Sequence, residues 1–103
     1  MASRTYIVTI DMSDPSVELD ALKEFIKSSP LFHGWWNHIP FVFLVTSDED
    51  AGTISEKLRR YTKDAKLLVM ETNPAESEGF LPEQSWKWIR RTSRSQAELS
   101  KTS

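Results

Sequence analysis

The 103-residue chain contains no cysteine. Disulfide bonds, thiolate metal sites and a cysteine nucleophile are therefore excluded, and a reducing cytoplasm suits this composition. Glycine is also scarce, with three residues, so a glycine-rich loop that cradles phosphates is not expected. The apolar runs are short, and none approaches the roughly 18 residues that a membrane-spanning helix needs. We therefore expect a cytoplasmic protein with no membrane partner.

Charge of one sign does not dominate the chain either. The formal net charge is −2, with 27% charged and 39% hydrophobic residues, which is ordinary for a globular protein. This balance gives the whole molecule no general attraction to nucleic acid or to an anionic membrane. The length allows one domain with one modest core.

The sequence does contain a clear alternation of strand and helix patterns. Four stretches rich in β-branched and aromatic residues predict strands. They are residues 5–12, 33–39, 41–46 and 66–72. Between them, apolar residues recur every three or four positions and predict two helices. The first helix is expected to begin at Pro15, with Asp14 as its N-cap. The second is expected to have Ser47 as its N-cap, because Ser47 and Asp50, three residues later, resemble a capping box.

The predicted order is strand, helix, strand, strand, helix, strand. Two right-handed crossovers joined by a hairpin then give an α+β, ferredoxin-like βαββαβ sandwich, with both helices on one face of an antiparallel sheet. After a turn-rich linker, a short helix from Pro82 to Ile89 is expected as a C-terminal extension. We therefore predict a single domain at 1–91. Residues 92–103 hold one leucine and little else apolar, and this predicts a disordered tail.

Several segments taken together resemble a known family. They are YIVTID, the Gly-Trp-Trp strand, FLV, a Leu-Arg-Arg helix, and LLVME followed by a tryptophan segment. From Thr5 to about Ile89 the chain resembles the small SinR-family proteins, which are related to the CRISPR-associated adaptation subunit (the Cas-two family) and to ferredoxin-like antitoxins. The resemblance implies a ferredoxin-like fold and a homodimer packed through the open sheet face. It also implies divalent-metal and nuclease chemistry at an Asp ending the first strand, and the matching residue here is Asp11.

Asp11 is accordingly the candidate for both catalysis and metal binding. Two copies across a dimer axis would offer the oxygen ligands that Mg²⁺ or Mn²⁺ prefers. The simpler interpretation, which we favour, makes Asp11 a solvated residue at a strand end, and no cofactor is then expected. His33 and His38 are five positions apart on a predicted strand, so they point to opposite faces and do not readily share a metal. We interpret both histidines as structural or surface residues.

Tryptophans mark the expected dimer interface. Trp35 and Trp36 are neighbours on a strand, so one should face the helix-side core and the other the open sheet face. An exposed tryptophan on an open sheet needs cover, from a dimer mate or from the segment with Trp86 and Trp88. We predict a homodimer with these four residues as candidate interface. Base stacking is the less favoured alternative.

A local basic stretch follows the last two tryptophans, and it comprises Lys87, Arg90, Arg91 and Arg94. Residues 86–103 carry five lysines or arginines and one glutamate. Such a stretch can neutralise phosphates, whereas the simpler interpretation is a solvated chain end. We predict a non-catalytic homodimeric interaction module, with nucleic acid or a protein as a further partner. The alternative is a metal-dependent endonuclease that uses Asp11 at the dimer interface, with Mg²⁺ or Mn²⁺ as cofactor.

Overall fold

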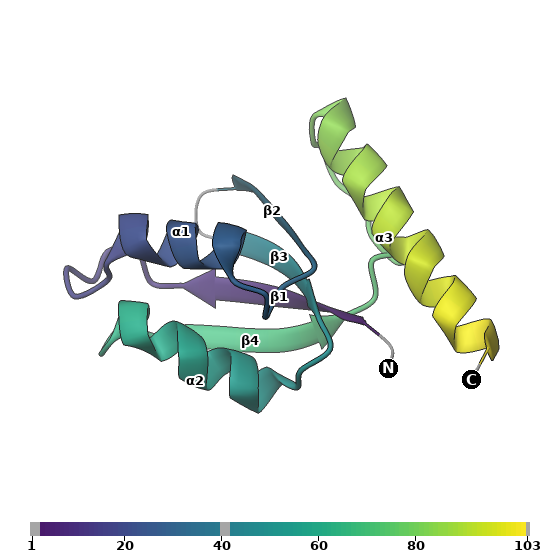
Figure 1. The fold of residues 1–103 in the computed structure, drawn as a ribbon. Coiled ribbons are helices and arrows are strands. Elements are labelled where there is room, and N and C mark those ends of the chain that lie inside the picture. The colour runs from purple at the N-terminus through teal and green to yellow at the C-terminus, as the bar shows by residue number, and fades with distance from the viewer. Residues whose placement is uncertain (1–2, 40–41, 103) are drawn as a thin grey trace.

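The computed structural model describes residues 3–39 and 42–102, without the side chains of His38 and of residues 93–102. The elements are β1 (Arg4–Ile10), α1 (Leu19–Ser28), β2 (Gly34–Ile39), β3 (Val42–Ser47), α2 (Ala51–Thr62), β4 (Leu67–Thr72) and α3 (Glu83–Thr102) (Figure 1). The four strands form one antiparallel sheet in the order β2-β3-β1-β4. This arrangement confirms the predicted α+β, ferredoxin-like βαββαβ fold.

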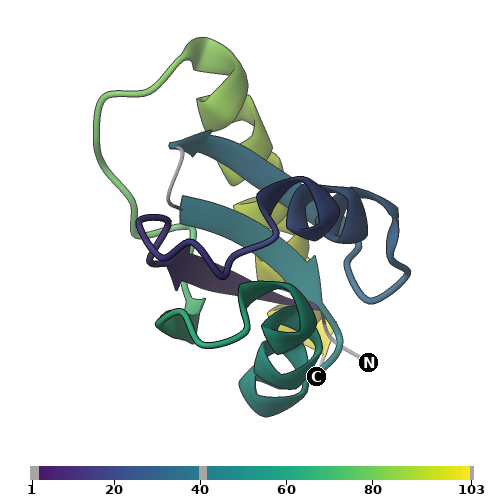
Figure 2. The same ribbon diagram turned by 90° about the vertical axis from the view of Figure 1, so that its left-hand side faces the viewer.

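The main core lies between the sheet and the pair α1 and α2, which cover one face of the sheet (Figure 2). Strand side chains alternate between faces, so every second residue of β1 points into this core. The fully or almost fully buried members are Tyr6, Val8, Ile10, Leu22, Ile26, Phe32, Phe43, Val45, Ile54 and Leu58. Burying each such large apolar side chain contributes roughly 1.5–3 kcal/mol. The two helical stripes read from the sequence are therefore core faces.

Helix α1 begins at Leu19, four residues after the expected start at Pro15. The Asp14 carboxylate does not cap this helix. It accepts hydrogen bonds from the backbone N–H of Ser16 (2.9 Å) and from its hydroxyl (2.8 Å), which closes a local turn. The Glu18 N–H donates to the Tyr61 carbonyl (2.8 Å) at the end of α2. The residues before α1 are thus held against α2 by this tertiary contact, and the helix begins only after Glu18.

Helix α2 begins after Asp50, whose carboxylate accepts from the Thr53 N–H at 2.8 Å. Asp50 is therefore the N-cap, and the expected cap at Ser47 was wrong. Ser47 instead ends β3 and is buried. Its hydroxyl donates to the Leu31 carbonyl (2.8 Å) and accepts from the Glu49 N–H (3.1 Å). This serine ties the connection after α1 to the connection before α2.

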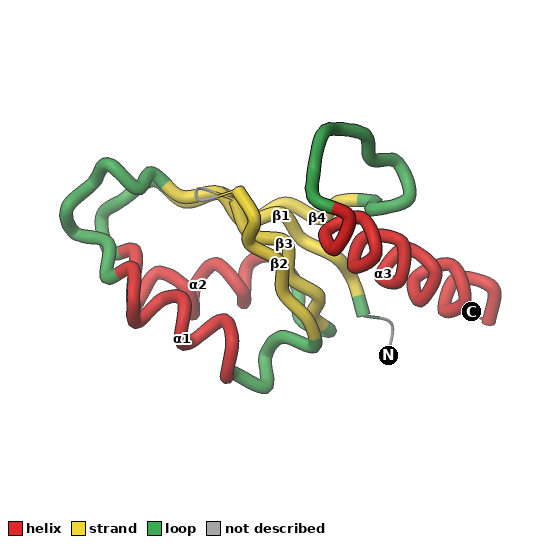
Figure 3. The backbone as a smooth tube through the Cα atoms, turned by 90° about the horizontal axis from the view of Figure 1, so that it is seen from above, coloured by secondary structure: helices red, strands yellow, loops and turns green. Residues whose placement is uncertain are grey.

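Helix α3 lies on the opposite side of the sheet from α1 and α2 (Figure 3). It crosses one end of this second face, where Gly34, Thr46 and Thr5 form a row across β2, β3 and β1. A Cβ at Gly34 would lie 3.7 Å from the Trp88 ring, so α3 approaches the sheet closely there. Thr5 is fully buried, and Trp36, in the adjacent row, is 5% exposed. The expected cover by the Trp86 and Trp88 segment is therefore present within one chain.

The other end of the second face carries exposed apolar side chains. Ile39 is 43% exposed, Leu68 49% and Met70 52%. The register places Leu68 and Ile39 in one cross-strand row and Met70 in the row beside it, on the face that α3 partly covers. Helix α3 thus shields one end of the face and leaves the β4 side open.

Helix α3 is longer than the short extension expected from the sequence. It continues to Thr102 and so includes residues 92–102, for which the sequence predicts disorder. A helical segment with few apolar side chains is marginal in water unless it packs on the domain, and the predicted disorder stays a prediction. No helix in residues 3–39 and 42–102 is both long and apolar enough to cross a membrane.

The domain boundary at Arg91 can be tested by truncation. A chain ending at Arg91 keeps Ile89 and Trp88, which pack on the sheet, and loses only the weakly apolar end of α3. We expect its free energy of unfolding to change by no more than about 0.5 kcal/mol, as is typical at exposed positions. Urea denaturation followed by tryptophan fluorescence measures this value. A loss of several kcal/mol would show that residues 92–103 pack on this chain or on a second copy.

Candidate nucleic-acid interface

One face of α3 is basic and the opposite face is buried. Ser85 and Ile89, four residues apart, are buried against the sheet side. Lys87, Arg90 and Arg91 follow the three- and four-residue spacing of a second stripe, and all three are exposed. At 100° per residue, the two stripes lie on opposite sides of the helix. Burial of the first stripe therefore directs these three cations to solvent.

Arg94 continues the basic stripe by one more turn, although its side chain lies outside the described residues. From Lys87 to Arg94 the helix rises about 10 Å, over which one strand of DNA presents roughly three phosphates. Helix α3 carries five lysines or arginines and two glutamates, Glu83 and Glu98, within a chain whose net charge is −2. Positive charge is thus concentrated on this element.

The exposed cations of α3 are not engaged by the rest of the described chain. The ion pairs between described side chains are Arg4 with Glu71, His33 with Asp48, and Lys63 with Glu18. Lys87, Arg90 and Arg91 take part in none of them. Their donors therefore face water and are available to an anionic partner without breaking an existing pair.

The start of α3 explains why the helix stands where it does. The Pro82 carbonyl accepts from the Ser85 N–H (3.0 Å) and the Trp86 N–H (3.4 Å), and these bonds close the first turn of the helix. Proline suits this position because it has no backbone N–H, and the first N–H groups of a helix have no partner within the helix. Glu83 lies in this first turn, where its negative charge complements the helix dipole. The expected start at Pro82 was therefore correct to within one residue.

Asp11 lies just beyond β1 and is exposed. Its carboxylate accepts hydrogen bonds from the Ser13 hydroxyl (2.5 Å) and from the Ser13 N–H (3.1 Å). These two bonds, the hydroxyl first, lower the pKa of Asp11 below its ordinary 3.8, and the charge of Lys66 acts in the same direction. Asp11 therefore stays ionised and organises the turn after β1.

The surroundings of Asp11 do not fit a divalent-metal site within one chain. A shallow pocket of about 290 Å³ is lined by Asp11 and Lys66 together with Thr9, Ile10, Leu67 and Leu68. Asp11 is the single carboxylate among the described residues that line it, and the Lys66 ammonium would repel a cation. Within the described part of the chain, no group of three His, Asp or Glu side chains is placed to hold a metal. The two-copy site stays a prediction.

The role of Ser13 can be tested on the Asp11 carboxyl group. Ser13→Ala removes the hydroxyl that contributes most to the lowered pKa, so we expect the Asp11 pKa to rise toward its ordinary 3.8. Ser16→Ala removes the equivalent bond to Asp14 and should leave Asp11 unchanged. Carboxyl-carbon NMR across an acid titration measures the Asp11 pKa in each variant. Because the folded-state pKa is depressed, the stabilisation by ionised Asp11 is present above the unfolded-state pKa and is lost as pH falls through the folded-state pKa.

His33 has a partner that sequence reasoning missed. Its Nε2 lies 3.0 Å from a carboxylate oxygen of Asp48. The pairing of β2 with β3 brings them together, because the His33 N–H donates to the Thr46 carbonyl (2.8 Å) and Asp48 follows two residues later. The register of β2 against β3, had it been predicted, would have placed His33 beside Asp48. The side chain of His38 lies outside the described residues.

The neighbouring tryptophans of β2 point to opposite faces, as predicted, but the one on the helix side is exposed and the one on the second face is buried. Trp35 pairs with Val45 on the helix side, is 40% exposed, and has the Lys27 Nζ 5.4 Å from its ring centroid. Trp36 pairs with Leu44 on the second face and is buried there. Trp86 and Trp88 are half-buried on α3. Their predicted role in a dimer stays a prediction, with Trp36 already covered by its own chain.

Comparison with models of protein families, with curated protein sequences and with solved structures gives no match for this chain.

Proposed function

We propose that this chain is a non-catalytic interaction module that binds the phosphate backbone of nucleic acid through the exposed face of α3. The observation that carries the proposal is the placement of Lys87, Arg90 and Arg91. All three are exposed and unpaired, while the opposite stripe of the same helix is buried. The cations are therefore held in a row by a packed element. A cytoplasmic location belongs to the same proposal.

The contact we propose is electrostatic and does not read base sequence. Lysine and arginine at the surface of a helix neutralise phosphates and release counterions, which makes binding strongly dependent on salt. Trp86 and Trp88 border the basic stripe and are half-buried, so stacking with bases stays the less favoured alternative. The fold itself carries no function, since one fold supports many activities. The resemblance to SinR-family and Cas-two proteins is thus a hypothesis that fits the fold.

Substitution of the basic stripe tests this proposal. In Lys87→Gln/Arg90→Gln/Arg91→Gln, we expect weaker binding to labelled single- and double-stranded RNA and DNA. The slope of log K against log salt should fall by about one unit for each cation that contacts a phosphate. Fluorescence anisotropy over a salt series measures both. The three side chains are exposed, so the variant should fold normally.

A matched control separates the stripe from overall charge. Lys23→Gln/Arg59→Gln/Lys66→Gln removes the same number of positive charges from α1, from α2 and from the residue before β4. It should bind like the native chain, and an equal loss in this variant would contradict the proposal. The same mixtures with Mg²⁺ or Mn²⁺ test the endonuclease alternative. Metal-dependent cleavage that disappears in Asp11→Asn would replace our proposal with that one.

Self-association is the second part of the proposed function. We propose that a second copy covers the end of the second sheet face that α3 leaves open, where Leu68 and Met70 are about half exposed on an edge strand. Apolar side chains gathered on one face are typical of an interface.

Light scattering should give about twice the chain mass of 11.9 kDa at micromolar concentration. Leu68→Glu/Met70→Glu should give a monomer, because two carboxylates would then be desolvated in the contact. Phe80→Glu changes a fully exposed apolar residue in the connection between β4 and α3, and this variant should stay dimeric. A native chain that is monomeric at every concentration would contradict this part.

A further inference from the structure

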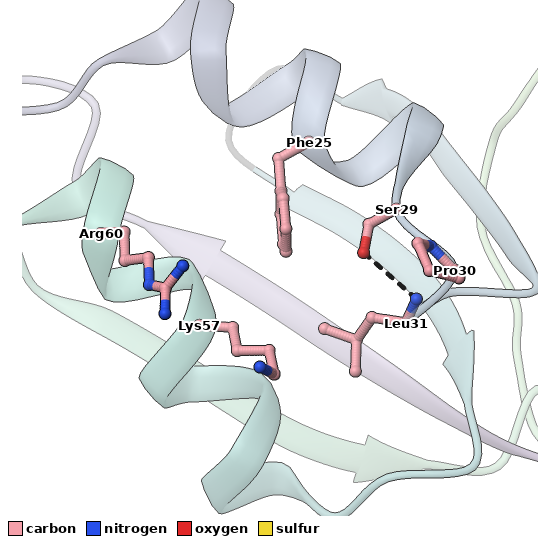
Figure 4. Close-up of a pocket in the computed structure, with 6 residues that line it drawn as sticks. All are labelled: Phe25, Ser29, Pro30, Leu31, Lys57 and Arg60. Atoms are coloured by element: carbon pink, nitrogen blue, oxygen red, sulfur yellow. Dashed lines mark hydrogen bonds between the residues drawn. The ribbon is translucent and has the colours of Figure 1, made fainter.

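A groove lies on the helix-covered side of the molecule, between the C-terminal end of α1 and the facing side of α2 (Figure 4). Its volume is about 300 Å³, at the lower end of the range for small-molecule sites. It is lined by Phe25, Ser29, Pro30, Leu31, Lys57 and Arg60. Helix α3 lies on the other side of the sheet, so this groove is separate from the proposed nucleic-acid interface (Figure 3).

The wall of the groove on the α1 side is apolar and rigidly held. The Phe25 ring lies 5.1 Å from the Tyr61 ring at an interplanar angle of 34°, and 6.1 Å from the Phe32 ring in an edge-to-face contact. Ring pairs of this kind fix the position of the central ring. Phe25 and Leu31 are only half-buried, so part of each faces the groove. A flat apolar group can therefore be covered without displacing a core residue.

The polar groups around the groove share one property, which is that all of them can donate a hydrogen bond. Lys57 and Arg60 stand one turn apart on α2 and project toward the gap (Figure 4). Neither has an ion-pair partner among the described side chains. The Ser29 oxygen accepts from the Leu31 N–H at 3.1 Å, which leaves its hydroxyl proton available. Among the residues that the structure describes, no carboxylate lines the groove.

This combination selects a class of ligand. Cations and a hydroxyl donor with no acceptor carboxylate favour an anion, and an arginine fork fits a carboxylate in particular. The apolar wall favours a planar or compact apolar group attached to that anion. We propose that the groove binds a small aromatic carboxylate. The ring lies against Phe25 and Leu31, and the carboxylate is bound by Lys57 and Arg60.

The test uses the full chain and 1-naphthoate as probe. Titration followed by ¹⁵N–¹H correlation spectra should shift the amides of Ser29, Leu31, Lys57 and Arg60 in a saturable manner. The neutral isostere 1-naphthamide should bind at least about threefold more weakly, since exposed ion pairs contribute modestly. Equal binding of the two compounds, or shifts that gather elsewhere on the chain, would overturn the proposal.

Two charge-matched variants complete the experiment. In Lys57→Gln/Arg60→Gln, the affinity for 1-naphthoate should fall by at least about threefold, and the affinity for 1-naphthamide should stay nearly unchanged. The variant would then have lost the preference for the anion. Arg59→Gln/Lys66→Gln loses the same charge outside the groove and should retain that preference. If both variants lose it equally, general electrostatic attraction explains the binding and the groove is not the site. All four side chains are exposed, so the fold should be unaffected. The result is independent of whether α3 binds nucleic acid.

Discussion

The packing of α3 on the second face of the sheet is the contact on which the functional surfaces of this chain depend. A four-stranded sheet built from alternating apolar residues has two faces to bury, and α1 and α2 cover one of them. Because Ser85 and Ile89 point to the sheet, Lys87 and Arg91 must point to solvent. Because α3 crosses only one end of the face, Leu68 and Met70 stay open. A single packing contact therefore accounts for both a basic surface and an apolar one.

Local patterns were sufficient to predict the core of the fold. Alternation along β1 and helical spacing in α2 gave the element order, and the order gave the topology, since few connections are compatible with it. Local sequence patterns did not predict the features that depend on contacts between residues far apart in the sequence. The start of α1 depends on a hydrogen bond between the Glu18 N–H and the Tyr61 carbonyl, and no local signal encodes it. Helix α3 continues past Ile89, where the sequence predicts its end, because low apolar content does not by itself determine backbone conformation.

The candidate sites were predictable to different extents. The basic stripe could be identified because its residues are close in sequence, although only helical geometry shows that Lys87, Arg90 and Arg91 share one face. The groove beside Phe25 could not, because its two walls come from segments about thirty residues apart. The pair His33 and Asp48 was missed since it depends on hairpin register. Asp11, named through a resemblance, forms local hydrogen bonds to Ser13 that an Asp-x-Ser sequence can suggest.

The two sides of the sheet bury different amounts of apolar surface. The sheet separates two apolar layers of unequal size, with ten buried residues in the cluster against α1 and α2, and a smaller contact around Trp36, Trp88 and Ile89 under α3. Because the layer under α3 is the smaller, separating α3 from the sheet would expose less apolar surface than separating α1 and α2. Release of α3 would expose Thr5 and Trp36 while β1 stays paired on both sides. A Cβ at position 34 would meet the Trp88 ring at an ordinary van der Waals distance of 3.7 Å, and its tighter contact would be the Thr46 hydroxyl oxygen at 3.3 Å.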